Sequence, residues 1–469
     1  MFIYDNYIHN LLRQAEQSAE SASADTGAAT DAEIKKIIEK AGRLEGLSHR
    51  EVAQLLMCRD QKHLELIFQT AAKVKAAVYG NRVVMFAPLY VSDWCVNKCA
   101  YCNYNSLHQF GRSRLTQEQV RMEVEVLEKM GHKRLALEAG QDSENCPIEY
   151  ILECLDTIYS MKTGKGAIRR VNVNVAATSV EDYKKLKAAG IGSYILFQET
   201  YHRPTYEKVH IAGPKKDFDY HLTALDRAME AGLDDVGGGA LFGLYDPYFE
   251  VLGLMLHNEH LEKNYGVGFH TVSVPRLCKA DGAIAAGYLY ALSDEVFMKI
   301  TAVLRLAIPF TGIIVSTRES YALRKKLINI GVSQISAGSV TKVGGYSAGL
   351  AAQSVAQFEK NDNSKIEDIA SWLLDENLIP SFCTACYRSG RTGGRFMGLA
   401  KTGKIKNVCQ PNALMTLWEY AMDYGSSDFV EKTRALIKSE LENIGDEKIR
   451  ELTAGNIEKI QNGQRDLFV

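Results

Sequence analysis

Strand-like runs and helical segments alternate in regular order between residues 82 and 340. Each short run of β-branched and apolar residues is followed by a longer segment in which apolar residues recur at helical spacing. Repeated strand-helix units of this kind build parallel sheets, so the alternation predicts an α/β fold. The eight runs are 83–91, 133–140, 169–177, 193–200, 235–243, 269–277, 312–317 and 333–338.

Eight consecutive units predict a closed (β/α)8 barrel of the TIM type, in which reactive groups lie on loops at the carboxyl ends of the strands. An open doubly wound sheet is the alternative, because the same alternation permits it. However, no dinucleotide-binding glycine pattern opens the first helix, and GGGALFG at 237–243 falls within the fifth strand. We therefore expect the barrel. Thr116 and Gln119 predict a capping box for one of its helices, and Gly131 is expected to end that helix.

Helical patterns flank the expected barrel on both sides. We predict an N-terminal helical extension over 1–80, the barrel over 81–340, and a mostly helical C-terminal region over 341–469. The segment 351–361 is among the helices expected in that last region.

Charge and hydropathy limit the possible partners. The formal net charge is -2 over 469 residues, and the basic and acidic residues are interspersed, which argues against nucleic-acid or anionic-membrane surfaces. No run approaches the roughly 18 apolar residues that would span a bilayer. We expect a cytoplasmic protein whose cysteines are reduced, so cysteine spacing indicates metal chemistry rather than disulfides.

Three cysteines lie close together just after the first strand-like run. Cys95, Cys99 and Cys102 form a CX3CX2C motif. Three thiolates leave one coordination position of a metal centre open, and a substrate or cofactor can bind and react at an open position. A zinc site completed by a nearby side chain such as His108 is the alternative interpretation.

The CX3CX2C motif, its place in a barrel and the aromatic Tyr101 resemble the radical S-adenosylmethionine (SAM) superfamily. The resemblance covers residues 80–340 and implies a 4Fe-4S cluster on the three cysteines, with SAM on the fourth iron. The cluster would pass an electron to SAM and so produce a 5'-deoxyadenosyl radical. By the same resemblance, the SAM contacts are Tyr101, Glu138, Asn172, Glu199 and the backbone around Ala240.

A second cysteine motif lies near the end of the chain. Cys383, Cys386 and Cys409 give CX2CX22C, which again supplies three thiolates. A zinc knuckle is the alternative, since CX2C is common in such sites. Arg388 and Arg391 follow the pair, and a cationic segment favours an anionic ligand or cluster.

Together with these motifs, QETYH at 198–202, SVPRL at 273–277 and STRES at 316–320 resemble the HydG family, the tyrosine lyases that mature FeFe-hydrogenase. The resemblance implies cleavage of L-tyrosine to p-cresol and dehydroglycine, and conversion of dehydroglycine to carbon monoxide and cyanide at a second 4Fe-4S cluster. The product would be the Fe(CO)2CN precursor of the hydrogenase active site. The three short motifs are shared with the sister family ThiH, the 2-iminoacetate synthases, and a non-enzymatic iron-sulfur scaffold is a further alternative.

The HydG resemblance also implies roles for individual residues and partners. Arg318 is the first candidate for a clamp on the tyrosine carboxylate, with Ser316 and Thr317 beside it, and Arg276 is the second. His270 is the candidate ligand of an additional labile iron at the second cluster. The implied partners are an electron donor protein, the scaffold GTPase HydF and the maturase HydE.

Overall fold

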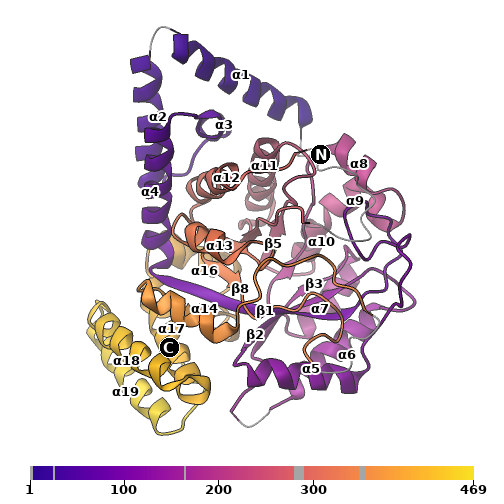
Figure 1. The fold of residues 1–469 in the computed structure, drawn as a ribbon, viewed down its shortest axis with the longest axis vertical. Helices are drawn as coiled ribbons and strands as arrows, with labels where there is room; N and C mark the ends of the chain where they lie inside the picture. Colours follow the sequence, from indigo (N-terminus) through magenta and orange to yellow (C-terminus); the bar gives the residue numbers. More distant parts are fainter. Residues whose placement is uncertain (1–3, 25–26, 163–164, 279–289, 348–353) are drawn as a thin grey trace.

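A closed barrel of eight parallel strands forms the centre of the molecule, with helices around it (Figure 1). The structure is a computed structural model that describes residues 4–24, 27–162, 165–278, 290–347 and 354–469. The barrel strands are β1 (Arg82–Ser92), β2 (Arg134–Ala139), β3 (Arg170–Asn174), β4 (Tyr194–Ile195), β5 (Val236–Gly239), β6 (Thr271–Ser273), β7 (Gly312–Val315) and β8 (Gln334–Ser336).

Strand β1 closes the barrel because it is long enough to meet different neighbours along its length. Residues 84–86 pair with β8, and residues 87–92 pair with β2. The other strands pair in chain order from β2 to β8. This closed parallel sheet confirms the predicted (β/α)8 class and excludes the open doubly wound alternative.

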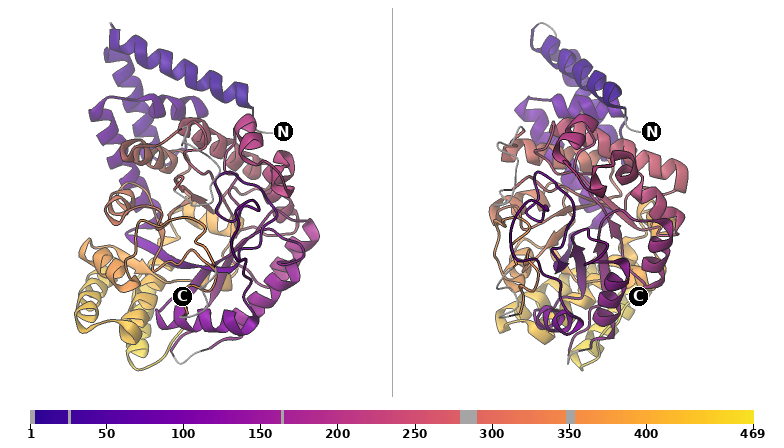
Figure 2. Two further views of the ribbon diagram at one scale, coloured as in Figure 1. Left: turned by 45° about the vertical axis from the view of Figure 1, so that its right-hand side comes forward. Right: turned by 90° about the vertical axis from the view of Figure 1, so that its right-hand side faces the viewer.

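Helices cover the outside of the barrel, as the two views of Figure 2 show. Thr116 and Gln119 form the predicted capping box of α5, and Gly131 follows its end with φ +92°. A Cβ atom at Gly131 would lie 2.4 Å from the ring of Tyr420, so this turn also requires glycine for close packing. The barrel helices are α5 (Gln117–Lys129), α6 (Ile148–Ser160), α7 (Val180–Ala188), α8 (Arg203–Val209), α9 (Phe218–Leu222), α10 (Ala224–Glu230), α11 (Pro247–Tyr265), α12 (Asp294–Ala307) and α13 (Tyr321–Ile328), with a 3-10 turn at Pro214–Lys216.

Four N-terminal helices lie against one side of the barrel (Figure 1). Ser48 and Glu51 form a capping box at the start of α3, and α4 packs along α12. Buried apolar residues such as Ile38 and Leu55 join this layer to the main core. The helices are α1 (Asp5–Ala24), α2 (Gly27–Gly42), α3 (His49–Met57) and α4 (Gln61–Tyr79).

The C-terminal region contributes a ninth strand to the same sheet. β9 (Ile379–Ser381) pairs in parallel with residues 82–84 of β1, at the amino end of the barrel. No local sequence pattern predicted this short strand, because its partner β1 lies almost 300 residues earlier in the chain. The surrounding helices are α14 (Ile366–Asp375), α15 (Ala385–Arg388), α16 (Gly393–Lys401), α17 (Lys406–Tyr424), α18 (Ser427–Glu442) and α19 (Glu447–Gln461).

One predicted helix is wrong. Of the segment 351–361, residues 354–361 are described and contain no helix. The backbone N–H groups of Gln357 and Asn361 instead donate to the carbonyl oxygens of Thr341 and Thr317, at 2.8 and 2.9 Å. Hydrogen bonds to the loops after β8 and β7 therefore replace helical ones. Among the described helices, none is long and apolar enough to cross a membrane.

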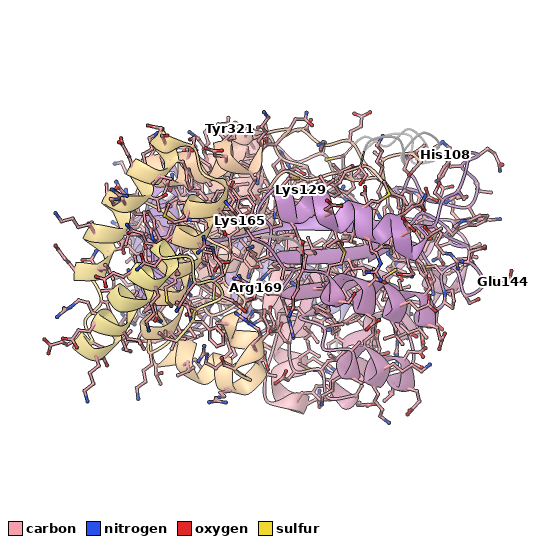
Figure 3. All side chains as sticks on the ribbon, turned by 90° about the horizontal axis from the view of Figure 1, so that it is seen from below. His108, Lys129, Glu144, Lys165, Arg169 and Tyr321 are labelled. Atoms are coloured by element: carbon pink, nitrogen blue, oxygen red, sulfur yellow. The ribbon has the colours of Figure 1, made fainter. Side chains whose placement is uncertain are left out.

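The two ends of the barrel carry different parts of the chain. Figure 3 shows His108 and Glu144, on the loops that follow β1 and β2, at the end far from the C-terminal helices. Arg169, just before β3, lies on the side of those helices. The first cysteine motif is therefore at the carboxyl ends of the strands, as predicted, and the second is at their amino ends.

Candidate active site and second cysteine site

The loop after β1 brings the first three cysteines together. Cys99 forms an antiparallel bridge with His210, and the N–H of Cys102 donates to the carbonyl of Cys99 at 3.2 Å. The N–H of Val96 donates to Gln141 on the next loop at 2.8 Å. These backbone bonds fix the loop over the barrel mouth without using the thiols.

A cavity of about 160 Å³ adjoins this loop. Of the residues predicted to contact SAM, Tyr101, Glu138 and Glu199 line it, together with all three cysteines. Asn174, Lys215, Arg318, Gln357 and Phe358 are further lining residues. One cavity therefore holds the thiols and both charged and apolar groups, as a site for a charged small molecule requires.

Burial raises the pKa of several groups that line this cavity. It raises the pKa of the Cys102 thiol to about 11, and it also raises the pKa of Cys99. A metal centre would reverse this preference, because it stabilises thiolates directly. Burial likewise raises the pKa of Glu138 to about 8, although a hydrogen bond from Asn174 and the charge of Arg318 act in the opposite direction.

Lys215 is a cavity residue that the sequence did not reveal. Its Nζ lies 2.6 Å from Oε1 of Glu199, and both side chains are largely buried. Glu199 itself has φ +68°, a left-handed conformation that is uncommon for a non-glycine residue and is frequent at functional sites. Lys215 lies in the 3-10 turn Pro214–Lys216 after α8, and no sequence motif marks it.

Two of the predicted SAM contacts lie elsewhere. Asn172 does not line the cavity; its Oδ1 accepts a hydrogen bond from the N–H of Ser193 at 3.0 Å, inside the barrel. Asn174, two residues later on β3, lines the cavity, because residues two apart on a strand share a face. Ala240 is fully buried and bridges to Glu199, while its neighbour Leu241 faces the cavity.

The two candidate arginines differ in their partners. Nε of Arg276 donates to Glu319 at 3.0 Å, and its Nη1 donates to Asp294 at 2.9 Å, so its charge is neutralised. Arg276 also lies outside the cavity of the three cysteines. Arg318 lines that cavity, and among the described residues its guanidinium forms no ion pair with a carboxylate, although the charge of Glu138 and the thiol of Cys278 are close enough to interact with it.

The two residues before Arg318 do not reach the cavity. The Oγ of Ser316 accepts a hydrogen bond from the N–H of Arg318 at 3.4 Å, and Thr317 is buried with its N–H bonded to Ser336 at 3.2 Å. They support the turn that presents Arg318, in contrast to the substrate contacts predicted for them.

A second cavity, of about 60 Å³, lies at the amino ends of the strands. His270 lines it together with Cys383, Cys386 and Cys409. The structure thus brings together one residue before β6 and two separate C-terminal segments. Further lining residues that the sequence did not single out are Tyr79, Arg82, Arg134, Asp235, Tyr387 and Phe396.

Comparisons with known proteins agree with this arrangement. The model of the radical SAM superfamily matches residues 89–255, and that of the biotin and thiamin synthesis associated domain matches residues 273–379. The 2-iminoacetate synthase of Salmonella typhimurium is 30% identical over 344 residues, which cover 73% of this chain and 89% of that protein. HydG from Carboxydothermus hydrogenoformans is 37% identical over 97% of this chain and 99% of that one, with a TM-score of 0.82.

A crystal structure of HydG, a maturase of the [FeFe]-hydrogenase, is 50% identical to this chain and covers 100% of both, with a TM-score of 0.94. The chain belongs to the HydG family. It is therefore a radical SAM maturase of the FeFe-hydrogenase type, and its family uses a 4Fe-4S cluster and SAM.

The first cysteine loop of this HydG family member fits such a cluster. Its three cysteines share one cavity with Tyr101 and Glu138, so that a ligand at the open coordination position would contact protein side chains. Asn97 donates from Nδ2 toward the sulfur of Cys95 at 3.7 Å, the kind of contact that stabilises a thiolate. No three His, Cys, Asp or Glu side chains among the described residues converge closely enough to hold a single ion.

His270 occupies a distinctive place in the HydG fold. It precedes β6 and therefore lies at the amino end of the barrel. Its Nδ1 is 3.7 Å from Oδ2 of Asp235, and its ring packs 4.6 Å from that of Phe396. The N–H of Ala385 donates to the sulfur of Cys383 at 3.4 Å. A nitrogen donor and three sulfur donors thus face one cavity, a set suited to iron.

Proposed function

We propose that this HydG family member cleaves L-tyrosine to p-cresol and dehydroglycine at the cavity of Cys95, Cys99 and Cys102. The observation that carries the proposal is the guanidinium of Arg318, which lines that cavity and forms no ion pair with a carboxylate among the described residues. The side chain is half-buried, and a substrate carboxylate could accept two parallel hydrogen bonds from it.

The residues around the cavity have separate tasks in this proposal. When bound, a reduced 4Fe-4S cluster on the three cysteines supplies one electron that cleaves SAM and so generates a carbon radical. Glu138, Glu199 and Tyr101 contact SAM, and the Glu199–Lys215 pair keeps one end of the cavity polar. Arg318 fixes the tyrosine carboxylate, so that the amino group from which a hydrogen atom is removed has one orientation.

We further propose that dehydroglycine is converted to carbon monoxide and cyanide at the second cavity, giving the Fe(CO)2CN precursor of the hydrogenase active site. A second 4Fe-4S cluster on Cys383, Cys386 and Cys409, extended by a labile iron, supplies the metal chemistry when bound. His270 is the nitrogen ligand of that extra iron, because it lines the cavity of the three thiols. The partners are an electron donor protein, the GTPase HydF and the maturase HydE.

A 2-iminoacetate synthase that serves thiamine biosynthesis is the second candidate, and the 30% identity to such an enzyme favours it. The match to that relative covers 73% of this chain. The second cysteine motif, in the C-terminal region, shares a cavity with His270 of the barrel, and this second site favours the first candidate. The two functions predict the same first products and differ in whether carbon monoxide and cyanide follow. A non-enzymatic scaffold would form none of these products.

One anaerobic assay separates the three functions. Reduced protein is mixed with SAM and L-tyrosine, and 5'-deoxyadenosine, p-cresol, carbon monoxide and cyanide are measured. We expect all four. Only 5'-deoxyadenosine and p-cresol would indicate the 2-iminoacetate synthase, and no product would indicate a scaffold. Cys383→Ser/Cys386→Ser is the control, since it removes the second site alone.

A further inference from the structure

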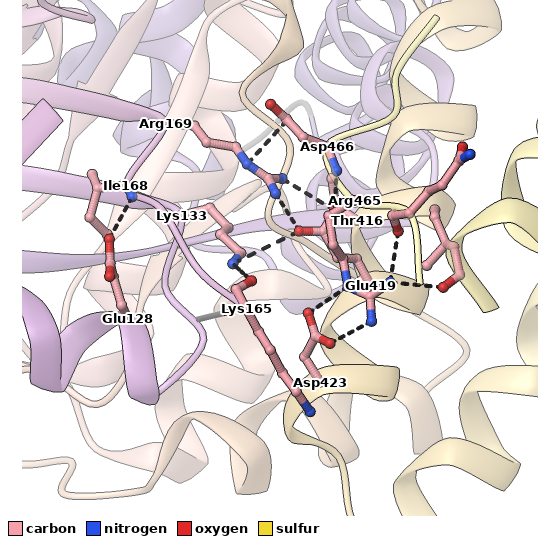
Figure 4. A network of polar contacts seen from close by, with 12 residues as sticks. Glu128, Lys133, Lys165, Ile168, Arg169, Thr416, Glu419, Asp423, Arg465 and Asp466 are labelled. Atoms are coloured by element: carbon pink, nitrogen blue, oxygen red, sulfur yellow. Dashed lines mark hydrogen bonds and ion pairs between the residues drawn. The ribbon is translucent and has the colours of Figure 1, made fainter. Parts of the chain in front are cut away.

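The segment 464–469 crosses the surface beside the second cysteine site, and we refer to it as the C-terminal strap. Asp466 connects two parts of the molecule there (Figure 4). Its Oδ2 lies 2.7 Å from Nη1 of Arg388, which belongs to the same short helix α15 as Cys386. Its Oδ1 lies 3.1 Å from Nε of Arg169, just before β3. The carboxylate of Asp466 thus joins α15, which carries Cys386, to the barrel.

The C-terminal strap also joins the two elements that carry cysteines. The N–H of Asp466 donates to Glu419 of α17 at 3.0 Å, and the N–H of Val469 donates to Asn412 of α17 at 2.9 Å. Arg391, three residues beyond the end of α15 at Arg388, donates from Nη2 to the main-chain oxygen of Val469 at 2.8 Å. Because α17 carries Cys409, the strap links the Cys386 helix to the Cys409 helix.

The conformation of Asp466 indicates that this position is tightly determined. Its φ is +65°, which is uncommon for any residue except glycine and is tolerated best by Asp and Asn. The guanidinium of Arg388 also packs 4.4 Å from the ring of Phe468. Several contacts therefore hold the Asp466 carboxylate against Arg388.

Residues of the barrel also contact α15 and Cys383 directly. Arg134 donates from Nη2 to the carbonyl of Cys383 at 2.9 Å, and the hydroxyl of Tyr387 lies 3.1 Å from that of Ser193. α15 is only four residues long, so it has little stability of its own. Contacts from both sides are needed to keep its thiol facing the cavity.

We propose that Asp466 is a positioning residue for the second cysteine site. By pairing with Arg388, it holds α15 against the barrel so that Cys386 and Cys409 face the same cavity as His270. The inference rests on the proposed function, in which these cysteines bind an iron-sulfur cluster. Asp466 does not line the cavity of the thiols and acts through Arg388.

The test isolates the second site. The parent is the full-length Cys95→Ser/Cys99→Ser/Cys102→Ser variant, reconstituted anaerobically, so that any cluster is on the tail cysteines. The rate at which an iron chelator bleaches the cluster absorbance is then measured. Asp466→Asn keeps the size and tolerates the positive φ, but loses the charge. We expect this variant to lose iron about threefold faster, the effect of a partly exposed ion pair.

Two further variants show whether the ion pair is responsible. Arg388→Gln should also accelerate the loss, and Asp466→Asn/Arg388→Gln should lose iron no faster than Asp466→Asn alone, since Asp466→Asn already removes the pair with Arg388 together with the pair with Arg169. Asp423→Asn is the matched control, because it breaks the 2.6 Å pair with Arg465 of the same strap and leaves Arg388 paired. Its rate should equal that of the parent.

Equal rates for Asp466→Asn and the parent, or an equal acceleration by Asp423→Asn, would overturn the inference. Additive effects of the Asp466 and Arg388 variants would overturn it as well. A parent that takes up no cluster would instead refute the second cluster of the proposed function, and this result is visible before any strap variant is made.

Discussion

The guanidinium carbon of Arg318 lies 3.3 Å from the ring centroid of Phe358, on the segment that replaces a predicted helix. The aromatic ring holds the arginine in place without using its N–H groups. Arg318 lines the cavity of the first three cysteines, where an anionic group could accept hydrogen bonds from its guanidinium.

Replacing Arg318 by Lys tests the proposed carboxylate clamp. Lys keeps the charge but loses the two parallel hydrogen bonds, so the apparent KM for tyrosine should rise by about tenfold to 100-fold, equivalent to roughly 1.5–3 kcal/mol. Steady-state p-cresol formation measures the change, and the dependence on SAM should move far less. An unchanged tyrosine KM would transfer the clamp to Arg276, despite its pairing with Glu319.

The two cysteine sites should separate two reactions. Cys95→Ser, Cys99→Ser or Cys102→Ser should abolish p-cresol and 5'-deoxyadenosine, because no radical forms without the first cluster. Cys383→Ser/Cys386→Ser should retain some p-cresol and lose the iron carbonyl product, which infrared spectroscopy detects. Equal loss of both activities in a folded tail variant would argue against two separate sites.

His270→Ala should remove the extra iron selectively. We expect this variant to keep both 4Fe-4S clusters and p-cresol formation, because the three cysteines at each site are unchanged. The high-spin signal of the additional iron in electron paramagnetic resonance and the ordered carbonyl-cyanide product should both be lost. If iron content, spectrum and product all stayed the same, His202 or His210 would have to be considered.

Glu250 makes the stability depend on pH. The residue is fully buried on α11 and accepts from the N–H of Tyr201 at 2.8 Å, and burial raises its pKa from 4.5 to about 8. The native state therefore keeps this proton between about pH 5 and pH 8, whereas the unfolded state loses it. Fewer protons are bound on unfolding, so the contribution of Glu250 to stability falls as pH rises, by roughly 1.4 kcal/mol per pH unit.

Glu250→Gln removes this titration and keeps an acceptor for Tyr201. The free energy of unfolding of the variant, minus that of the wild type, should increase from pH 5 to pH 8 in urea titrations. Glu118→Gln, on the exposed face of α5, should give a difference that does not vary in this way. A difference that is constant over the range for Glu250→Gln as well would contradict the linkage.

Local patterns predicted most of the barrel. All eight strand-like runs contain a strand, and Thr116 caps α5 as expected, because hydrophobic period and capping depend on residues near in sequence. β9 and the non-helical segment after residue 353 were not predicted. Both are set by hydrogen bonds to distant partners, Val83 on β1 for the strand and Thr341 for Gln357, which no local pattern records.

The sequence by itself determined which residues form the cysteine loops, since the spacings within Cys95–Cys102 and Cys383–Cys386 are local. Only the tertiary structure decided what surrounds them. Asn174, and not Asn172, lines the first cavity because strand register sets the depth of each side chain in the barrel. The structure distinguishes the two candidate arginines, because Glu319 pairs with Arg276 and not with Arg318. Which side chains pair depends on their arrangement in space, and local sequence does not record it.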